Sequence, residues 1–305
     1  MKIKLNFNKG FTLIELMITL LLSLLITYGI AQVLTTSNRT SVTSDGMSQS
    51  QETGRFVMTY LAKYIRTAGL NSLNTDSHTT KAFISCTDFP DLINDGACIS
   101  EDGSGKNQTT IRSNGVQGDL LAVASIIPPN GNASDCSGST GYWPLDKKPE
   151  SAPMIKYAED DLIINTFWVE FDSTAKVSNL MCKGFLFNGT DVIGRSTKQA
   201  IANGVEAMHL LYGEALTERS AKNERNAGHY VRAPTNPKNP KKDIEVNDWS
   251  KVYSVKISIL TRSLTEVTNK DTLRRYILAD ATPYDMTDAV SRQVFTTTFA
   301  INNFW

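Results

Sequence analysis

The chain has 305 residues, and its 31 basic and 31 acidic residues cancel to a net charge of zero. This balance excludes a strongly basic protein, so we predict no nucleic-acid partner. The apolar content of 41% and the aromatic content of 9% are ordinary for a globular protein.

The first predicted element is a long apolar helix behind a short basic leader. Residues 1–10 form the leader, and the apolar segment begins at Phe11. It contains one acid, Glu15, and then no charge until Arg39. A helix needs about 20 apolar residues to span a bilayer. We therefore predict a transmembrane helix over about residues 11–34.

The flanking charges predict how this helix is oriented. Lys2, Lys4 and Lys9 precede it, and the leader has no acidic residue. Positively charged flanks stay in the cytoplasm. We therefore expect a single-pass inner-membrane protein whose part after about residue 34 lies in the periplasm.

The small residue Gly10 stands before the apolar segment. An ordinary secretory signal has its small residues and its cleavage site after the apolar stretch. A cut after Gly10 would instead leave the apolar helix as the new N-terminus of the chain. Glu15 is then a costly charge at membrane depth, and such residues usually have a partner and a function.

The run Lys9-Gly10-Phe11-Thr12-Leu13-Ile14-Glu15 resembles the class III signal of type IV prepilins. The resemblance implies that a membrane prepilin peptidase cuts between Gly10 and Phe11 and that Phe11 is N-methylated. It also implies an assembly role for Glu15. Its carboxylate would pair with the free amine of a neighbouring subunit, and an α-amino group is mostly protonated at neutral pH.

The helix is predicted to continue beyond the membrane to residue 69. Residues 35–55 are polar and include Gly46 and Gly54, so this stretch is either a solvated helix or partly unwound. After it, the spacing of three and four residues predicts an amphipathic helix. Its apolar face holds Val57, Tyr60, Leu61, Tyr64, Ile65 and Ala68, its polar face holds Arg55, Thr59, Lys63, Arg66 and Thr67, and Gly69 is a suitable C-cap.

Residues 70–305 read as strands and loops and can bury a sizeable core, as one large domain or two small ones. The predicted strands are 120–124, 162–171 and 177–187 joined as a hairpin through 172–174, 201–212, 253–259 and 295–301. Residues 214–250 have three prolines and many charges, which predicts one long exposed loop that proteases cut near Lys222–Lys242. The predicted fold class is α+β, with the long N-terminal helix packed on an antiparallel β-sheet domain.

Four cysteines, Cys86, Cys98, Cys136 and Cys182, follow the predicted membrane span. An even number in an oxidising compartment favours disulfides over free thiols, and four cysteines allow three connectivities. We favour Cys86–Cys98 and Cys136–Cys182. No pair has the C-x-x-C spacing of a zinc or redox site.

No catalytic, cofactor or metal motif is complete. His78, His209 and His229 are far apart and have no companions at metal spacing, and His209 fits a packed position in a strand. The run Gly103-Ser104-Gly105-Lys106 lacks the first glycine and the following Ser or Thr of a phosphate loop. We therefore predict no cofactor, no metal and no enzymatic activity.

Later segments are similar to PilW-type minor pilins. These are Gln51-Glu52-Thr53-Gly54-Arg55-Phe56, Ile65-Arg66-Thr67-Ala68-Gly69, Gly204-Val205-Glu206, Leu211-Tyr212-Gly213 and Arg292-Gln293-Val294-Phe295-Thr296-Thr297-Thr298. The resemblance implies a structural minor pilin that acts in type IV pilus assembly, initiation and the tip complex. The implied partners are other minor pilins, the major pilin, the prepilin peptidase, the inner-membrane assembly machinery and a tip adhesin.

Two other functions are consistent with parts of the sequence. A large J-type pseudopilin of a type II secretion system shares the N-terminal signal and the size, and only the PilW-like segments favour the pilus. A membrane-anchored periplasmic enzyme would need a convergent polar cleft in residues 70–305, which the sequence does not display.

Overall fold

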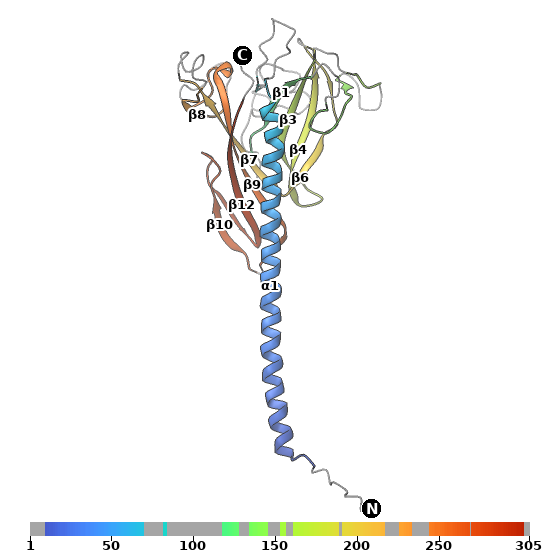
Figure 1. Cartoon of the computed structure of the whole chain (residues 1–305), viewed down its shortest axis with the longest axis vertical. Coiled ribbons are helices and arrows are strands. Elements are labelled where there is room, and N and C mark those ends of the chain that lie inside the picture. The colour runs from blue at the N-terminus through green and yellow to red at the C-terminus, as the bar shows by residue number, and fades with distance from the viewer. Residues whose placement is uncertain are drawn as a thin grey trace, which may run out of the picture. The chain divides into compact units, whose positions relative to one another are not determined.

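The computed structural model separates the chain into two compact units, Met1–Asp45 and Gly46–Trp305. The structure describes residues 10–69, 82–83, 118–127, 134–145, 153–156, 161–188, 191–216, 226–233, 244–268 and 270–301. Helix α1, Leu13–Arg66, runs without a break through 54 residues (Figure 1). The polar stretch 35–55 is therefore helical and not unwound, which decides between the two expected alternatives.

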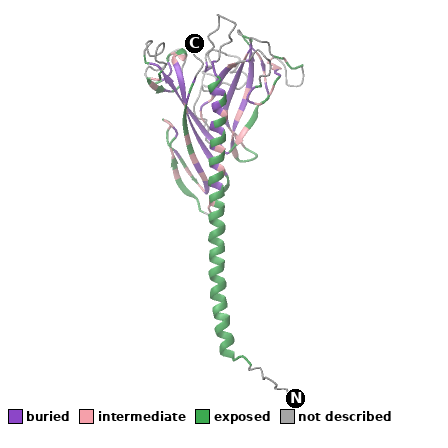
Figure 2. Cartoon of the chain, in the orientation of Figure 1, coloured by how far each residue is buried: buried purple, intermediate pink, exposed green. Residues whose placement is uncertain are grey.

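The first part of α1 is exposed, and the second part is packed. Every residue from Gly10 to Val42 is exposed (Figure 2), and an 18-residue window in α1 reaches a mean hydropathy of 2.2, enough for a membrane span. The predicted apolar face is buried apart from the half-buried Tyr60, and the predicted polar face is exposed. The helix ends at Arg66, three residues before the expected end, so the prediction of Gly69 as its C-cap is wrong. Gly69 has the left-handed φ of 69°, but its amide donates to the Ala124 carbonyl of β1 and not to a helix carbonyl.

The β-strands follow the helix. They are β1 Leu121–Ile126, β2 Trp143–Pro144, β3 Leu162–Asp172, β4 Val177–Phe187, β5 Val192–Arg195, β6 Gln199–Asn203, β7 Val205–Glu214, β8 His229–Val231, β9 Val252–Glu266, β10 Thr272–Tyr276, β11 Tyr284–Asp288 and β12 Val290–Ala300, and the 3-10 helix η2 covers Trp249–Lys251. One sheet has the order β1-β3-β4-β5-β2, with β6 also paired to β4. A second has the order β12-β9-β7-β8, and β10 and β11 form a separate pair.

All of these strand pairs are antiparallel, which confirms the predicted α+β class. The β3–β4 hairpin pairs in full register from Leu162↔Phe187 to Asp172↔Val177, as expected. The predicted strand over 201–212 is divided at Gly204, which has a φ of 81°. There the chain passes from β6 in the first sheet to β7 in the second.

The two sheets and the second part of α1 share one core. The sheets lie to either side of this part of the helix in Figure 1, and β7 contacts both β3 and β4. Val57, Leu61 and Ile65 pack among apolar residues of both sheets. Those partners include Phe167 and Leu180 from the first sheet and Met208, Leu210, Val255, Ile257 and Ile259 from the second.

The expectation of one exposed loop over 214–250 is wrong for the part of it that the structure describes. Strand β8 pairs with β7, and Ala215, Ala233 and Val246 are buried. The cause is Glu214, whose buried carboxylate accepts hydrogen bonds from the amides of Asn247 and Asp248 and holds the end of the segment against its start. Lys222 and Lys242 lie outside the described residues, so the predicted protease cuts stay a prediction.

Candidate functional site

The candidate processing and assembly residues lie at the exposed start of α1. A Cβ added to Gly10 would meet no atom within 4 Å, and Phe11 is 88% exposed. The Gly10–Phe11 peptide bond is therefore accessible directly ahead of the helix. The leader residues 1–9, including Lys2, Lys4 and Lys9, lie outside the described part of the chain.

Glu15 has hydrogen-bond partners at its own helix start. Its Oε2 accepts from the Thr12 amide at 3.1 Å and from the Thr12 hydroxyl at 3.1 Å. The Glu15 amide donates to Thr12 Oγ1 at 3.3 Å. This is a capping box, in which the N-cap residue and the third helical residue satisfy each other's amides.

The capping box gives Glu15 a role that the sequence analysis missed. The T-x-x-E spacing that predicts such a cap was visible in Thr12-Leu13-Ile14-Glu15. A carboxylate at a helix N-terminus is also stabilised by the helix dipole. The cap therefore orients the Glu15 carboxylate toward Thr12, the residue that follows Phe11.

Small residues on the second part of α1 let it pack closely on the second sheet. Gly46, Ser50 and Gly54 follow one another at four-residue intervals, and all three are buried. A Cβ on Gly46 would come within 2.2 Å of Val267, and one on Gly54 within 2.2 Å of the Phe295 ring. The two glycines therefore mark close contacts with the sheet rather than weak points in the helix.

Two hydrogen bonds join the same part of the helix to β9. The Thr261 hydroxyl donates to the Ser50 carbonyl at 3.0 Å, and the Leu264 amide donates to Gln49 Oε1 at 3.0 Å. Helix residues 46–54 thus dock through backbone contact and polar bonds, without the large apolar side chains that sequence patterns detect.

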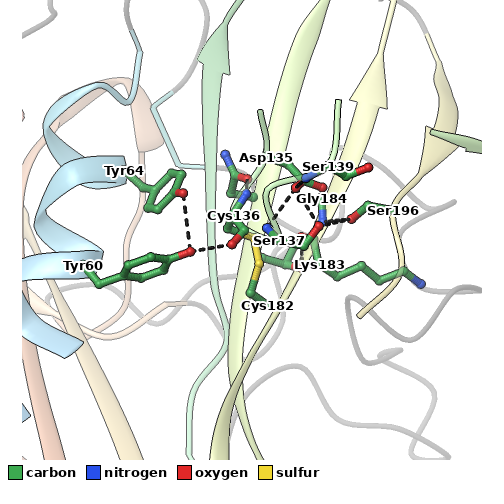
Figure 3. Close-up of a disulfide and its surroundings, with 12 residues drawn as sticks. Tyr60, Tyr64, Asp135, Cys136, Ser137, Ser139, Cys182, Lys183, Gly184 and Ser196 are labelled. Atoms are coloured by element: carbon green, nitrogen blue, oxygen red, sulfur yellow. Dashed lines mark hydrogen bonds between the residues drawn. A yellow bond between two sulfur atoms is a disulfide. The ribbon is translucent and has the colours of Figure 1, made fainter. Parts of the chain in front are cut away.

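The predicted Cys136–Cys182 disulfide is confirmed, and it lies beside the Tyr60 side chain of α1 (Figure 3). It joins the loop before β2 to β4. The Tyr60 hydroxyl donates to the Cys136 carbonyl, and the Cys136 amide donates to Asn165 Oδ1 at 2.7 Å. Burial, together with the hydrogen bond to Tyr64, raises the pKa of Tyr60 above its ordinary value.

The loop that carries Cys136 is held by an aspartate. Asp135 Oδ1 accepts from the Ser137 amide at 2.8 Å and the Ser139 amide at 2.9 Å. A Cβ on Gly184 would lie 2.0 Å from Asp135 Oδ2, so glycine is needed there for close approach. Disulfide, loop, β4 and helix therefore form one rigid assembly. Cys86 and Cys98 lie outside the described residues, and their disulfide stays a prediction.

A buried charge network links three strands of the second sheet to the β10–β11 pair. Arg292 on β12 donates to Glu206 on β7 at 3.0 Å and to Asp288 on β11 at 2.6 Å and 2.7 Å. Arg262 on β9 donates to Glu206 at 3.4 Å. Burial alone would lower the pKa of Arg292, but its hydrogen bonds to Asp288 and Glu206 raise it. This network stabilises the fold. It could not be predicted from the sequence, because Glu206 lies far from its arginine partners along the chain.

The histidines give no metal site in the part of the chain that the structure describes. No group of three or more His, Cys, Asp and Glu residues there could hold a metal ion. His209 is packed, as expected, with Nε2 against the Tyr284 hydroxyl and Nδ1 3.6 Å from Asp119. His78 and the residues Gly103–Lys106 lie outside the described residues.

Two family models match the chain. One is described as type IV pilus-assembly protein W and covers residues 166–303, from β3 through β12. The other is the prokaryotic N-terminal methylation motif and covers residues 5–27, which include Gly10, Phe11 and Glu15. No curated protein and no solved structure gives a significant match. One match covers the start of the exposed helix, and the other covers strands of both sheets. Together they identify the chain as a PilW-type prepilin, a membrane-anchored pilin of type IV pili.

Proposed function

We propose that this pilin is a minor subunit that initiates type IV pilus assembly and remains in the complex at the pilus tip. The observation that carries the proposal is the PilW match over the β domain, combined with the methylation motif on the exposed helix. A β domain built of two sheets and an added hairpin suits a rare subunit at an end better than a repeating major subunit. Its role is structural and not enzymatic.

The mechanism begins with the precursor in the inner membrane. The apolar side chains of residues 13–34 face lipid, and the β domain lies in the periplasm. The prepilin peptidase cuts between Gly10 and Phe11, and Phe11 is then N-methylated. A glycine suits this cut because its lack of a side chain lets the backbone enter a narrow protease cleft.

Assembly then replaces lipid contacts of the helix with contacts to other pilin helices. The new amine belongs to Phe11, the residue before Thr12, and the Thr12 cap already orients the Glu15 carboxylate. Between subunits, the Glu15 carboxylate pairs with the amine of a neighbouring subunit, and this pairing sets the register of docking. The partners are other minor pilins, the major pilin, the inner-membrane assembly machinery and a tip adhesin.

Deletion of the gene tests the pilus role directly. We expect few or no surface pili and loss of twitching motility, with secretion of exoproteins unchanged. Normal pili together with impaired secretion would contradict the proposal and indicate a secretion pseudopilus.

Mass spectrometry of protein from the native host should give a mature N-terminus of methylated Phe11, whereas an intact leader would contradict the processing step.

Replacement of the acid tests the docking step separately. We expect Glu15→Ala to leave membrane insertion intact or improved, because it removes a charge that is costly in lipid. Incorporation into pili should fall, because the neighbouring amine loses its partner. Wild-type incorporation of this variant would show that the pairing is not required.

A further inference from the structure

Three edges of the described sheets, at β1, β8 and β2, are covered by a bridging segment. Beyond β1, the Ala124 amide donates to the Ala82 carbonyl at 3.1 Å. Beyond β8, Arg232 exchanges bonds of 3.0 Å and 2.8 Å with Ile244 and Val246. Next to β2, Tyr142 and Ile155 exchange amide–carbonyl bonds of 3.0 Å and 2.7 Å. Natural proteins cover or blunt sheet edges in this way to prevent unwanted strand pairing.

Other edges are protected by length or by charge. Strand β6 is short, and its register with β4 shifts between Leu180 and Met181. Strand β10 carries Arg274 and Arg275, and β11 carries Asp285 and Asp288. Short strands, bulges and charges all disfavour the addition of a further strand.

Strand β12 differs from all of these. Among the described residues it pairs only with β9, and the pairing is regular from Arg292↔Arg262 to Ala300↔Ser254. Residues 293–300, Gln-Val-Phe-Thr-Thr-Thr-Phe-Ala, contain no charge and no proline. Thr296, Thr297 and Thr298 are exposed on both faces of the strand. This edge is long, regularly paired and uncharged over residues 293–300.

The backbone of β12 is available for pairing. In an antiparallel ladder, alternate residues direct their amide and carbonyl groups toward opposite sides of the strand. At the start of the strand, Arg274 and Thr261 donate to the carbonyls of residues 290 and 293, and the amide of residue 291 donates to the Ser263 hydroxyl. From Val294 to Ala300, the described residues offer no partner on the side away from β9. Such an edge is a template for an additional strand.

We propose that the β12 edge is the docking site for an uncharged, extended segment of another pilus subunit, which joins the second sheet as a further antiparallel strand. The proposal rests on the pilus role proposed above. Backbone hydrogen bonds supply the attraction, and alternating β-branched or aromatic side chains of the partner fit beside the threonines. Because residues 293–300 are neutral, the complementary segment is neutral too.

The geometry of α1 argues against a second copy of the chain as the partner. Gly46 contacts Val267, Ser50 bonds to Thr261, and Gly54 contacts Phe295, so the second part of α1 runs along β9 and β12. Antiparallel pairing of two β12 strands would therefore point two copies of this helix in opposite directions. Two chains anchored in one membrane by the same end cannot pair in that way.

A lysine on the edge tests the proposal in a strain from which the gene is deleted. The full-length wild-type chain, Thr297→Lys, Thr297→Val and the control Thr287→Lys, at an exposed position of β11, are each restored at equal levels. We expect Thr297→Lys to give about tenfold fewer pili per cell, because a charge on an edge disfavours strand addition. Thr297→Val and Thr287→Lys should restore wild-type numbers. Full restoration by Thr297→Lys would overturn the proposal, whereas normal pili in the deletion strain would overturn only the pilus role.

Photo-cross-linking provides a second measurement that does not depend on the stability of a charged variant. A photoreactive phenylalanine derivative replaces Thr297 or, as a control, Thr287 in the full-length chain in cells. We expect an adduct from position 297 to a segment of a different pilus subunit. The additional substitution Thr298→Lys, between position 297 and Phe299, should abolish that adduct. Adducts only to a second copy of the chain, or equal adducts from positions 297 and 287, would overturn the proposal.

Discussion

The two parts of helix α1 differ in what covers their apolar side chains. From Leu13 to Leu34, every large apolar side chain is exposed, and no described residue of the chain covers it. From Gly46 to Arg66, the buried residues face two β-sheets of the same chain. The second part is therefore stabilised by folding alone, whereas the first requires lipid or other helices to remove its apolar surface from water.

The two parts also hold their carboxylates differently. Glu15 is exposed and, among the described residues, accepts hydrogen bonds only from Thr12, the residue directly before the helix. In the β domain, Glu206 is buried and pairs with Arg292, which is 86 residues away. The first carboxylate can exchange its partner without disturbing the fold, whereas the second cannot.

The largest effect is expected when the buried pair is broken. Arg292→Met leaves Glu206 buried without its main partner, and this should lower the free energy of unfolding by about 3–5 kcal/mol. Arg275→Met is the matched control, because it breaks an exposed pair with Asp285 that water screens, so its effect on the free energy of unfolding should be far smaller. Denaturant unfolding of the full-length protein in detergent measures both. Similar losses in the two variants would show that the buried network is not specially stabilising.

A leucine in each part of α1 tests the comparison directly. Leu61 is fully buried, and Leu61→Ala should lower the free energy of unfolding of the β domain by about 2–5 kcal/mol. Leu21 is exposed, so Leu21→Ala should leave that unfolding unchanged. Thermal unfolding followed by near-UV circular dichroism provides the measurement. A shift of the domain transition by Leu21→Ala would mean that the two parts are not energetically separate.

Gly54 and Gly29 allow a second comparison between the two parts of α1, with a smaller expected effect on the unfolding of the β domain. The side chain of Gly54→Leu would have to displace the Phe295 ring, at a cost of about 1–3 kcal/mol. A Cβ on Gly29 meets nothing within 4 Å, so Gly29→Leu should not destabilise the domain. The same unfolding experiment compares them. If Gly54→Leu is as stable as the wild type, the helix is not closely docked at that point.

The apolar part of the docking surface could be predicted from sequence, but its small-residue part could not. Val57, Leu61 and Ile65 repeat with the period of a helix, and this signal is local. Gly46 and Gly54 have no hydrophobic signal of their own. Their partners Val267 and Phe295 lie more than 200 residues later, so only the folded sheet reveals why these positions are glycine.

A similar limit applies within the β domain. The alternating residues of β9 and β12 predicted strands, but the pairing that brings Glu206 to Arg292 depends on the order β12-β9-β7. The short strands β10 and β11 are charged and lack a clear alternation, so they were missed. The Cys136–Cys182 pairing was predicted as the pair that remains once Cys86 and Cys98 are joined. The Thr12–Glu15 cap could have been read directly from its four-residue spacing.

The smallest effect is expected at that cap, and it sharpens the contrast between the two carboxylates. In Thr12→Ala the Glu15 amide loses its acceptor, and Glu15 keeps only the bond from the residue-12 amide. Loss of an N-cap costs about 1 kcal/mol. The cost should appear only as faster hydrogen exchange of the amides in the first turn of α1, with the unfolding midpoint of the β domain unchanged.

Thr19→Ala is the control for this cap. The Thr19 hydroxyl only donates to the Leu16 carbonyl of its own helix, so its removal leaves no amide without an acceptor. Exchange measured by mass spectrometry on the full-length protein in micelles should therefore separate the two variants. Equal exchange in both would show that Thr12 does not hold the helix start. Glu15 would then meet an incoming amine as an unrestrained side chain, and the proposed orientation of its carboxylate before docking would have to be abandoned.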